Sequence, residues 1–227
     1  MRRPVSLLLS ALIAVPALAA IGLDSLTNKD ASGGLREALT QGAQMAVAAL
    51  GKENGFYGDP RVKIPLPESL QKVEKPMRMM GMGKQFDELV LSMNRAAEAA
   101  VPEAKVLLTD AVKKMTVEDA KKILTGGDTA GTEYFKKHTE APLAKKFLPM
   151  VKQATDKVGL AQQYNSLAGQ AKTFGLVKDD QATIEQYVTK KTLDGLYLMI
   201  AEEEKAIRKD PVGQSSALLK KVFGALR

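Results

Sequence analysis

The sequence contains no cysteine, no tryptophan and a single histidine among its 227 residues. Without cysteine, the chain can form no disulfide, no thiolate metal site and no thiol nucleophile. Aromatic residues make up only 5% of the chain, so few rings are available to stack against nucleic-acid bases. Disulfide scaffolds and cysteine enzymes are therefore excluded, and nucleic acid is not an expected partner.

Long hydrophobic runs are also scarce, and the marked example lies at the start of the chain. Two arginines precede an apolar run at 5–15, and the small-residue triplet Ala-Leu-Ala follows at 17–19. This order is typical of a cleaved secretory signal peptide; a retained N-terminal anchor is the alternative, but the run is short for a bilayer-spanning helix. We expect residues 1–19 to be removed, residues 20–227 to form a single domain, and the protein to be periplasmic, with no transmembrane segment in the mature chain.

Acidic residues are fewer than basic ones, 26 against 33, and the formal net charge is +7. Six Lys-Lys doublets are spread along the chain, at 113–114, 121–122, 136–137, 145–146, 190–191 and 220–221. Lysines distributed in this way usually cover the rim of a core with their alkyl stems. A basic exported protein is also attracted to anionic surfaces. The candidate partners are anionic lipid, a glycan or another envelope protein.

No segment shows the alternation of a strand, and the chain is rich in Ala, Leu, Lys, Glu and Met, which favour helix. The clearest pattern lies between Lys84 and Met115, where apolar residues recur at steps of three and four. These positions are Phe86, Val90, Met93, Ala97, Val101, Ala104, Leu108, Ala111 and Met115. Because the stripe stays in phase across Pro102, it predicts one kinked helix rather than two independent helices.

Glycine, proline and capping residues predict where other helices begin and end. Thr116 and Asp119 predict a capping box at the start of a short helix. The helix that begins at Glu68 is expected to kink or end at Pro76. The stretch 51–67 is rich in Gly and Pro and predicts a long loop with a short extended piece at 61–64.

Further helices are expected, and together they define the fold class. They cover 33–50 with Ser32 as cap, 142–157 with a bend at Pro149, 160–174, 181–208 with Asp179 or Asp180 as cap, and 217–226. The fold class is therefore all-α, an irregular helical bundle of about eight or nine helices without substantial sheet.

The stretch ILTGGDTAGTEYF (123–135) suggests two interpretations. Its glycines are reminiscent of a phosphate-binding loop, but such a loop follows a strand and normally supplies a lysine. Here a helical pattern precedes the glycines, and Asp128 places a negative charge where an anion would bind. We favour a helix end followed by a helix start, with Gly126 left-handed and Asp128 as the next N-cap.

Several long stretches resemble the bacterial family called domain of unknown function 4197. They are KIPLPESLQK (63–72), SMNRAAEAAVPEAK (92–105), ILTGGDTAGTEYF (123–135), KVGLAQQYNS (157–166) and YVTKKTLDGLYLMIAEEEKAIRKDPVG (187–213). The resemblance covers nearly all of the chain after the predicted signal peptide, and Pro76 and His138 depart from the family pattern. It implies an exported helical protein of proteobacterial type, and it implies no activity.

Residues with catalytic or metal-binding chemistry are few. His138 stands alone, without a G-x-S-x-G or metal-ligand motif, and is expected at a solvated helix end. Glu202, Glu203 and Glu204 point about 100° apart on a helix, so they cannot converge on one metal; a solvated face with Glu202 pairing to Lys205 is expected. No catalytic residue, metal site or cofactor is predicted.

One set of polar residues borders the apolar stripes and is a candidate pocket lining. Its members are Asn94, Glu98, Tyr134, Tyr164, Asn165, Tyr187, Lys191 and Asp194. If their helices converge, these side chains would surround the mouth of a pocket between helices. The alternative is that they form buried, paired hydrogen bonds between packed helices.

Two classes of function fit these observations. The first is a non-enzymatic binding or scaffolding protein for an amphipathic or acidic envelope component, and ten methionines are compatible with adaptable apolar surfaces. The second is a hydrolase that uses a carboxylate pair on a cell-wall polymer. A deep cleft with a carboxyl group of raised pKa would favour the hydrolase, and an apolar tunnel would favour the binding protein.

Overall fold

The computed structural model describes residues 27–157, 159–173, 183–210 and 216–225. The predicted signal peptide and the predicted caps Asp179 and Asp180 lie outside these residues. The described part is helical and contains no strand, which confirms the all-α class. Its elements are α1 (Asn28–Leu50), α2 (Glu68–Met77), a π-helical turn (Arg78–Met82), α3 (Gly83–Ala100), a 3-10 turn (Val101–Glu103), α4 (Ala104–Lys114), α5 (Val117–Leu124), α6 (Ala130–Lys157), α7 (Leu160–Thr173), α8 (Ile184–Lys209) and α9 (Ala217–Gly224).

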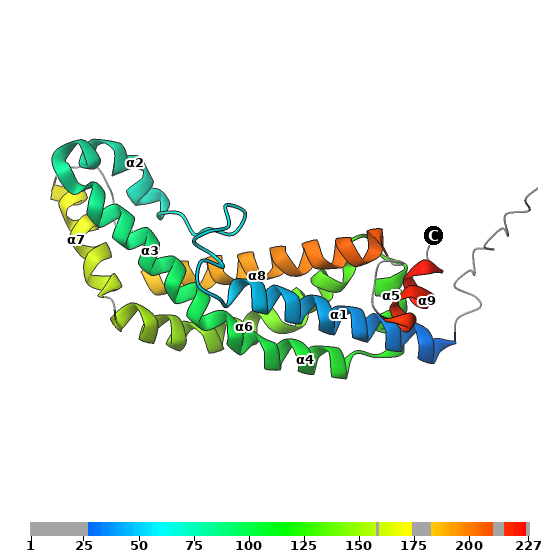
Figure 1. The fold of residues 1–227 in the computed structure, drawn as a ribbon. Helices are drawn as coiled ribbons and strands as arrows, with labels where there is room; N and C mark the ends of the chain where they lie inside the picture. Colours follow the sequence, from blue (N-terminus) through cyan, green and yellow to red (C-terminus); the bar gives the residue numbers. More distant parts are fainter. Residues whose placement is uncertain (1–26, 158, 174–182, 211–215, 226–227) are drawn as a thin grey trace, which may run out of the picture.

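The molecule is elongated and curved (Figure 1). Helices α1, α4, α6 and α8 run along its length, α5 and α9 lie at one end, and α2 and α7 lie at the other. Helix α8 packs against both α6 and α1. The largest fully buried side chains include Phe56, Phe86, Phe135 and Phe147. They belong to one core that extends from Leu70 and Val73 of α2 to Val222 and Phe223 of α9.

The apolar stripe between Lys84 and Met115 is confirmed as a kinked helix. Helices α3 and α4 are joined by the 3-10 turn at Val101–Glu103, where Pro102 interrupts the α-helical hydrogen bonding. Eight of the nine predicted stripe residues are buried, and the ninth, Val90, packs against the core. Burial of this continuous stripe keeps α3 and α4 in phase across the kink.

Helix α6 contradicts the expected separate helix at 142–157, because it runs from Ala130 through Pro142 and Pro149 without a break. A proline inside a helix costs about 3 kcal/mol. The same helix has four large apolar side chains with 0% exposure, and each contributes about 1.5–3 kcal/mol when buried. These side chains are Phe135, Leu143, Phe147 and Val151. Packing along one stripe therefore outweighs the cost of both prolines.

Two predicted helix starts are wrong by several residues. Helix α1 begins at Asn28, where the Thr27 hydroxyl accepts a 3.1 Å hydrogen bond from the Asp30 amide, whereas Ser32 is buried inside the helix. Helix α8 begins at Ile184 with Thr183 as its cap in a capping box. The predicted capping box of Thr116 and Asp119 at the start of α5 is confirmed. In all three helices a threonine hydroxyl satisfies an amide that the first turn leaves unpaired.

The stretch 123–135 is a helix end followed by a helix start, but the predicted details are wrong. Gly126 does not have a left-handed backbone conformation. A Cβ at this position would lie 2.7 Å from the Cβ of Ala130, so the lack of space favours glycine here. Asp128 is not the N-cap, because α6 begins two residues later at Ala130. The amides of the first turn of α6 are satisfied from another helix, as described below.

The end of the molecule formed by α2 and α3 contains a sharp reversal. Helix α2 continues through Pro76 to Met77, and the π-helical turn then includes Gly81 with φ of 86°. This left-handed conformation favours glycine, since other residues lose free energy there through contact of Cβ with the backbone. The prediction that the helix would kink or end at Pro76 is confirmed to within one residue, because α2 ends at Met77, and the chain then reverses at Gly81.

Candidate functional site

The stretch 51–67 lies against α3 in a defined conformation. Phe56, Val62, Ile64 and Leu66 are buried, and Lys63 between them is exposed. The Asn94 side chain on α3 accepts a 2.8 Å hydrogen bond from the Ile64 amide and donates a 2.9 Å bond to the Ile64 carbonyl. Asn94 thereby satisfies the Ile64 backbone as a neighbouring strand would.

Glu98, one turn further along α3, holds the first half of the same loop. Its Oε1 accepts hydrogen bonds from the backbone amides of Phe56, at 3.0 Å, and Tyr57, at 3.1 Å. Arg95 donates a 2.6 Å bond to the other carboxylate oxygen and contacts Glu53 and Asn54 of the loop. The buried carboxylate is therefore paired on both oxygens, as a buried charge requires.

Three of the eight candidate pocket residues meet at this loop. Tyr187 on α8 donates hydrogen bonds to the carbonyls of Pro65, at 2.9 Å, and Leu66, at 3.3 Å, and burial raises its pKa to about 12. Asn94, Glu98 and Tyr187 thus hold the loop backbone from two helices. The sequence analysis gave two interpretations of these residues, a pocket lining or paired hydrogen bonds between packed segments. The hydrogen bonds of Asn94, Glu98 and Tyr187 are of the second kind.

The other five candidate residues are placed elsewhere. Tyr134 on α6 donates a 3.2 Å hydrogen bond to the carbonyl of Ala111 on α4. Lys191 lies over the Tyr187 ring, with 5.9 Å from its Nζ to the ring centroid, and Asp194 is exposed. Tyr164 packs against the core from α7, and Asn165 is exposed. Whether any of the eight contacts a ligand stays a prediction.

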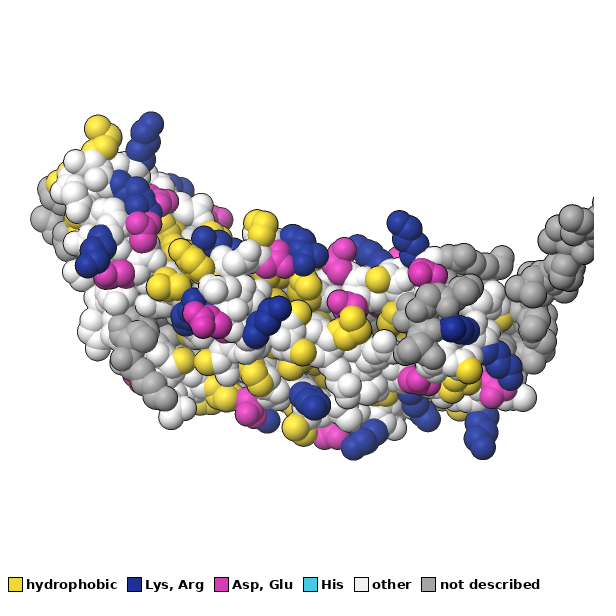
Figure 2. Space-filling view, viewed as in Figure 1, with side chains coloured by type: hydrophobic (Ala, Val, Ile, Leu, Met, Phe, Trp, Pro, Cys, Tyr) yellow, Lys and Arg dark blue, Asp and Glu magenta, His cyan; other side chains and the backbone are white. Residues whose placement is uncertain are grey.

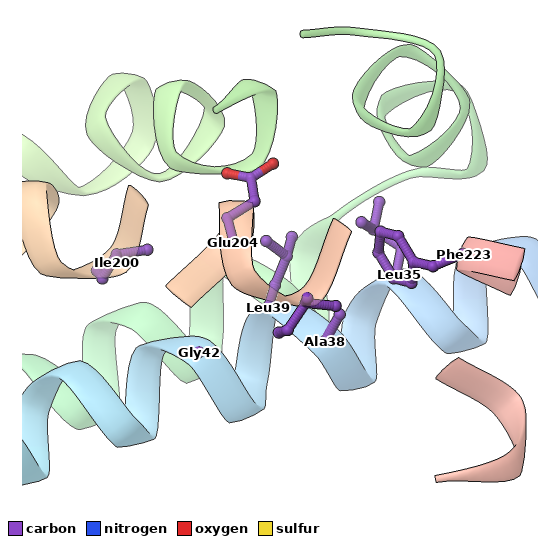
Figure 3. A pocket seen from close by; sticks show the side chains of 8 residues that line it. Leu35, Ala38, Leu39, Gly42, Ile200, Glu204 and Phe223 are labelled. Atoms are coloured by element: carbon purple, nitrogen blue, oxygen red, sulfur yellow. The ribbon is translucent and has the colours of Figure 1, made fainter. Parts of the chain in front are cut away.

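Glu204 is a buried charged residue that the sequence interpretation missed. It was expected on a solvated face, but only 6% of its side chain is exposed. Its carboxylate accepts hydrogen bonds from the Gly131 amide at 2.9 Å, the Thr132 amide at 2.8 Å and the Thr132 hydroxyl at 2.9 Å. Figure 3 shows this carboxylate directed away from α1 towards the neighbouring helix. Glu204 therefore caps the N-terminus of α6 from another helix, where the helix dipole favours a negative charge.

Arg208 completes this network. It donates hydrogen bonds to Glu204 Oε1, at 3.1 Å from Nε and 2.9 Å from Nη2, and a 2.9 Å bond to the Ile123 carbonyl near the end of α5. Glu204 and Arg208 together connect the end of α5 and the start of α6 to α8. The position of Glu204 four residues after buried Ile200 was a signal for its burial, since residues four apart share a helix face.

Close packing around Glu204 leaves little space. A Cβ on Gly131 would lie 2.4 Å from Leu39 Cδ2 and 3.1 Å from Glu204 Oε1, so the carboxylate reaches the helix only because residue 131 is glycine. The adjoining cavity, lined by side chains of α1, α8 and α9, has a volume of about 10 Å³ (Figure 3). A space of this size holds at most one water molecule, so it is a packing defect and not a ligand site.

An open groove lies between the 51–67 loop, α2 and α3, and we call it the α2 groove. Its volume is about 680 Å³, within the range of about 300–1,000 Å³ that ligand pockets usually have. It is lined by Tyr57, Pro60, Lys63, Pro65, Leu66, Gln71, Glu74, Arg78, Asp87 and Val90. A second hollow of about 420 Å³ shares Gln71, Glu74 and Arg78 with it and extends to Lys75 and Met79.

Arg78 organises the charges in the α2 groove. It donates a 2.8 Å hydrogen bond to Glu74, a 2.6 Å bond to Asp87 and a 3.2 Å bond to the Gly83 carbonyl. The hydrogen bond from Arg78 lowers the pKa of Asp87, and the positive charges of Arg78 and Lys63 act in the same direction. The guanidinium is thus held in one orientation by groups from α2 and α3.

Two methionines are exposed near the α2 groove, and the first of them, Met79, lines the second hollow. Met79 is 82% exposed and Met80 is 56% exposed, beside the left-handed Gly81. Lys72 and Lys75 on α2 are exposed and form no ion pair with a described residue. Figure 2 shows hydrophobic and basic side chains together at this end of the molecule. We call Met79 and Met80 the methionine tip.

Two properties of the described residues bear on function. No group of three or more His, Asp or Glu side chains among them is arranged to hold a metal ion. None of the described helices combines the length and the apolar character needed to cross a bilayer.

Comparison with known proteins adds the family. The model for the family described as protein of unknown function (DUF4197) matches residues 25–224. The chain belongs to this family. The matched residues include the loop, α2, α3, α6 and α8, and therefore the parts of this chain that form the α2 groove and the Glu204 network. No curated protein and no solved structure matches the chain.

Proposed function

We propose that this DUF4197 protein is an exported, periplasmic, non-enzymatic binding or scaffolding protein for an amphipathic envelope component. The polar part of that component occupies the α2 groove, and its apolar part contacts the methionine tip. Exposed methionines are suited to this contact because their flexible, polarisable side chains adapt to irregular apolar surfaces.

The observation that supports this proposal is the continuity between polar and apolar surface. The two hollows share Gln71, Glu74 and Arg78, so one surface extends from Tyr57 and Lys63 to Met79. Large exposed side chains of this kind often mark an interaction site when they adjoin polar groups. A purely acidic component is less favoured, because Arg78 is already paired with two carboxylates.

The hydrolase alternative is less favoured by the same geometry. Glu74 and Asp87 are the carboxylates of the α2 groove, and a general acid needs a raised pKa to hold its proton at neutral pH. The hydrogen bond from Arg78 instead lowers the pKa of Asp87. The buried carboxylates Glu98 and Glu204 are already bound to backbone amides. These observations favour binding over turnover.

Binding of the purified protein to phospholipid vesicles tests the proposal. We expect saturable binding to vesicles that contain anionic lipid, because the exposed lysines Lys72 and Lys75 attract the vesicle surface and the methionine tip contacts its apolar part. Binding should be weaker at high salt, which screens the two lysines. The double variant Met79→Ser/Met80→Ser should bind at least about tenfold more weakly, since burying a methionine contributes about 1.5–3 kcal/mol.

The matched control is Met45→Ser, which changes another exposed methionine, 47% exposed, on α1. This variant should bind as the unsubstituted protein does, and all variants should keep their thermal unfolding temperature. No vesicle binding, or equal losses in the tip and control variants, would count against the proposed function.

A further inference from the structure

We propose that the polar half of the α2 groove binds a neutral saccharide. The inference rests on the proposed function for the location of the site, and it deepens that function by naming the chemistry of the polar part of the ligand. It does not depend on the methionine tip, so a water-soluble saccharide tests it separately.

The charges of the groove favour a neutral ligand. Lys63 and Arg78 contribute two positive charges, and Glu74 and Asp87 contribute two negative charges. Arg78 is bound to both carboxylates, at 2.8 and 2.6 Å. An anion would have to compete with these carboxylates for the guanidinium, and a cation would have to displace Arg78 from them. A ligand without net charge avoids both costs.

The hydrogen-bonding groups of the groove match hydroxyl groups, each of which both donates and accepts. The bonds to Arg78 use Glu74 Oε1 and Asp87 Oδ1, which leaves the second oxygen of each carboxylate as an acceptor. Tyr57 lines the same groove, and its hydroxyl has no hydrogen-bond partner among the described residues. Donors and acceptors therefore lie side by side, as neighbouring sugar hydroxyls require.

The walls of the groove are preorganised. Glu98 holds the Tyr57 amide, and Asn94 holds the backbone of Ile64 next to Lys63. The Lys63 Nζ lies 4.1 Å from the Tyr57 ring centroid. Pro60 and Pro65 add rigid apolar surface between these polar groups, against which the C–H faces of a sugar ring can pack. Fixed groups of this kind reduce the entropy lost on binding.

Titration of the full protein with the tetramer of N-acetylglucosamine, a neutral soluble probe, tests the inference by calorimetry and by NMR. Saturable binding is expected, with shifts of the amide signals of residues 57–66. The variant Glu74→Gln/Asp87→Asn keeps side-chain size and removes both negative charges of the groove. Lys63 and Arg78 then give the groove a net charge of about +2. It should bind the neutral tetramer at least about tenfold more weakly, because charge-assisted hydrogen bonds are lost. It should bind a galacturonic acid tetramer more tightly than the unsubstituted protein does.

The control variant Glu103→Gln/Asp110→Asn removes two carboxylates, 43% and 48% exposed, from ion pairs elsewhere on the surface. It should bind the neutral tetramer normally. Should the groove variant unfold, Tyr57→Phe replaces it, with a severalfold loss expected. Absence of binding, stronger binding of the anionic tetramer by the unsubstituted protein, or equal losses in groove and control variants would overturn the inference. Loss of vesicle binding in the methionine-tip variant does not bear on this outcome.

Discussion

The buried carboxylates of this protein differ from those of the α2 groove in the groups that they bind. Glu98 and Glu204 accept hydrogen bonds from backbone amides as well as from an arginine. Among the described residues, Glu74 and Asp87 bind only the side chain of Arg78. The same residue types therefore connect chain segments in the core and leave acceptor oxygens for a ligand at the surface.

The reason for this difference is the cost of removing a charge from water. A buried carboxylate must have all its hydrogen-bonding capacity satisfied, because an unpaired buried charge costs several kcal/mol. A half-exposed carboxylate can leave an oxygen to water or to a ligand at little cost. The comparison predicts that substitutions in the core reduce stability, whereas substitutions in the groove reduce binding.

The largest expected effect follows removal of Glu204. Glu204→Ala leaves Arg208 without its carboxylate, and leaves the amides of Gly131 and Thr132 unpaired. We expect the free energy of unfolding to fall by about 3–5 kcal/mol, as when one partner of a buried pair is removed. Urea denaturation measures this change.

The matched control for this prediction is Glu202→Ala on the same helix. The Glu202 side chain is 43% exposed, and the described residues offer it one ion pair, with Lys205, so this variant should change stability by less than about 0.5 kcal/mol. Similar losses in both variants would show that Glu204 does not stabilise the α5–α6 junction through its buried bonds.

A smaller effect is expected for Glu98. Glu98→Ala leaves the amides of Phe56 and Tyr57 without their acceptor, and should cost about 2–3 kcal/mol. Hydrogen exchange at these two amides should accelerate more than exchange in α8, because the loop loses its attachment to α3. Glu88→Ala, half exposed on the same helix, should leave exchange at Phe56 and Tyr57 unchanged. An unchanged exchange rate in the Glu98 variant would contradict the assigned role.

The smallest expected effect concerns pH and the groove. The pKa of Asp87 is lowered in the folded protein, so the stabilisation from its bond to Arg78 is present above the unfolded-state pKa, about 3.9. It is lost as the pH falls through the folded-state pKa. An NMR titration of the Asp87 carboxyl group should therefore have a midpoint below about 3.9, and saccharide binding should persist down to about pH 5. A midpoint above the unfolded-state value would show that Arg78 does not act on Asp87.

The sequence predicted what depends on neighbours in the chain. The spacing from Phe86 to Met115 predicted a helix in phase across Pro102, because residues three and four apart share a face. Thr116 and Asp119 predicted a helix start from two side chains three residues apart in one turn. The family resemblance was also carried by contiguous stretches, and the match over residues 25–224 confirms it.

The tertiary structure decided what depends on partners far along the chain. Glu204 was misplaced because its partners, Gly131 and Thr132, lie more than 70 residues away, at separations of 73 and 72. Pro142 did not end α6, because burial of Leu143 and Phe147 outweighs one proline. The α2 groove was missed because it brings the 51–67 loop beside α2 and α3, and the periodicity of one helix contains no information about a surface shared by three segments. Local hydrogen bonds can be predicted from the sequence, whereas burial and charge pairing depend on which surfaces the fold brings together.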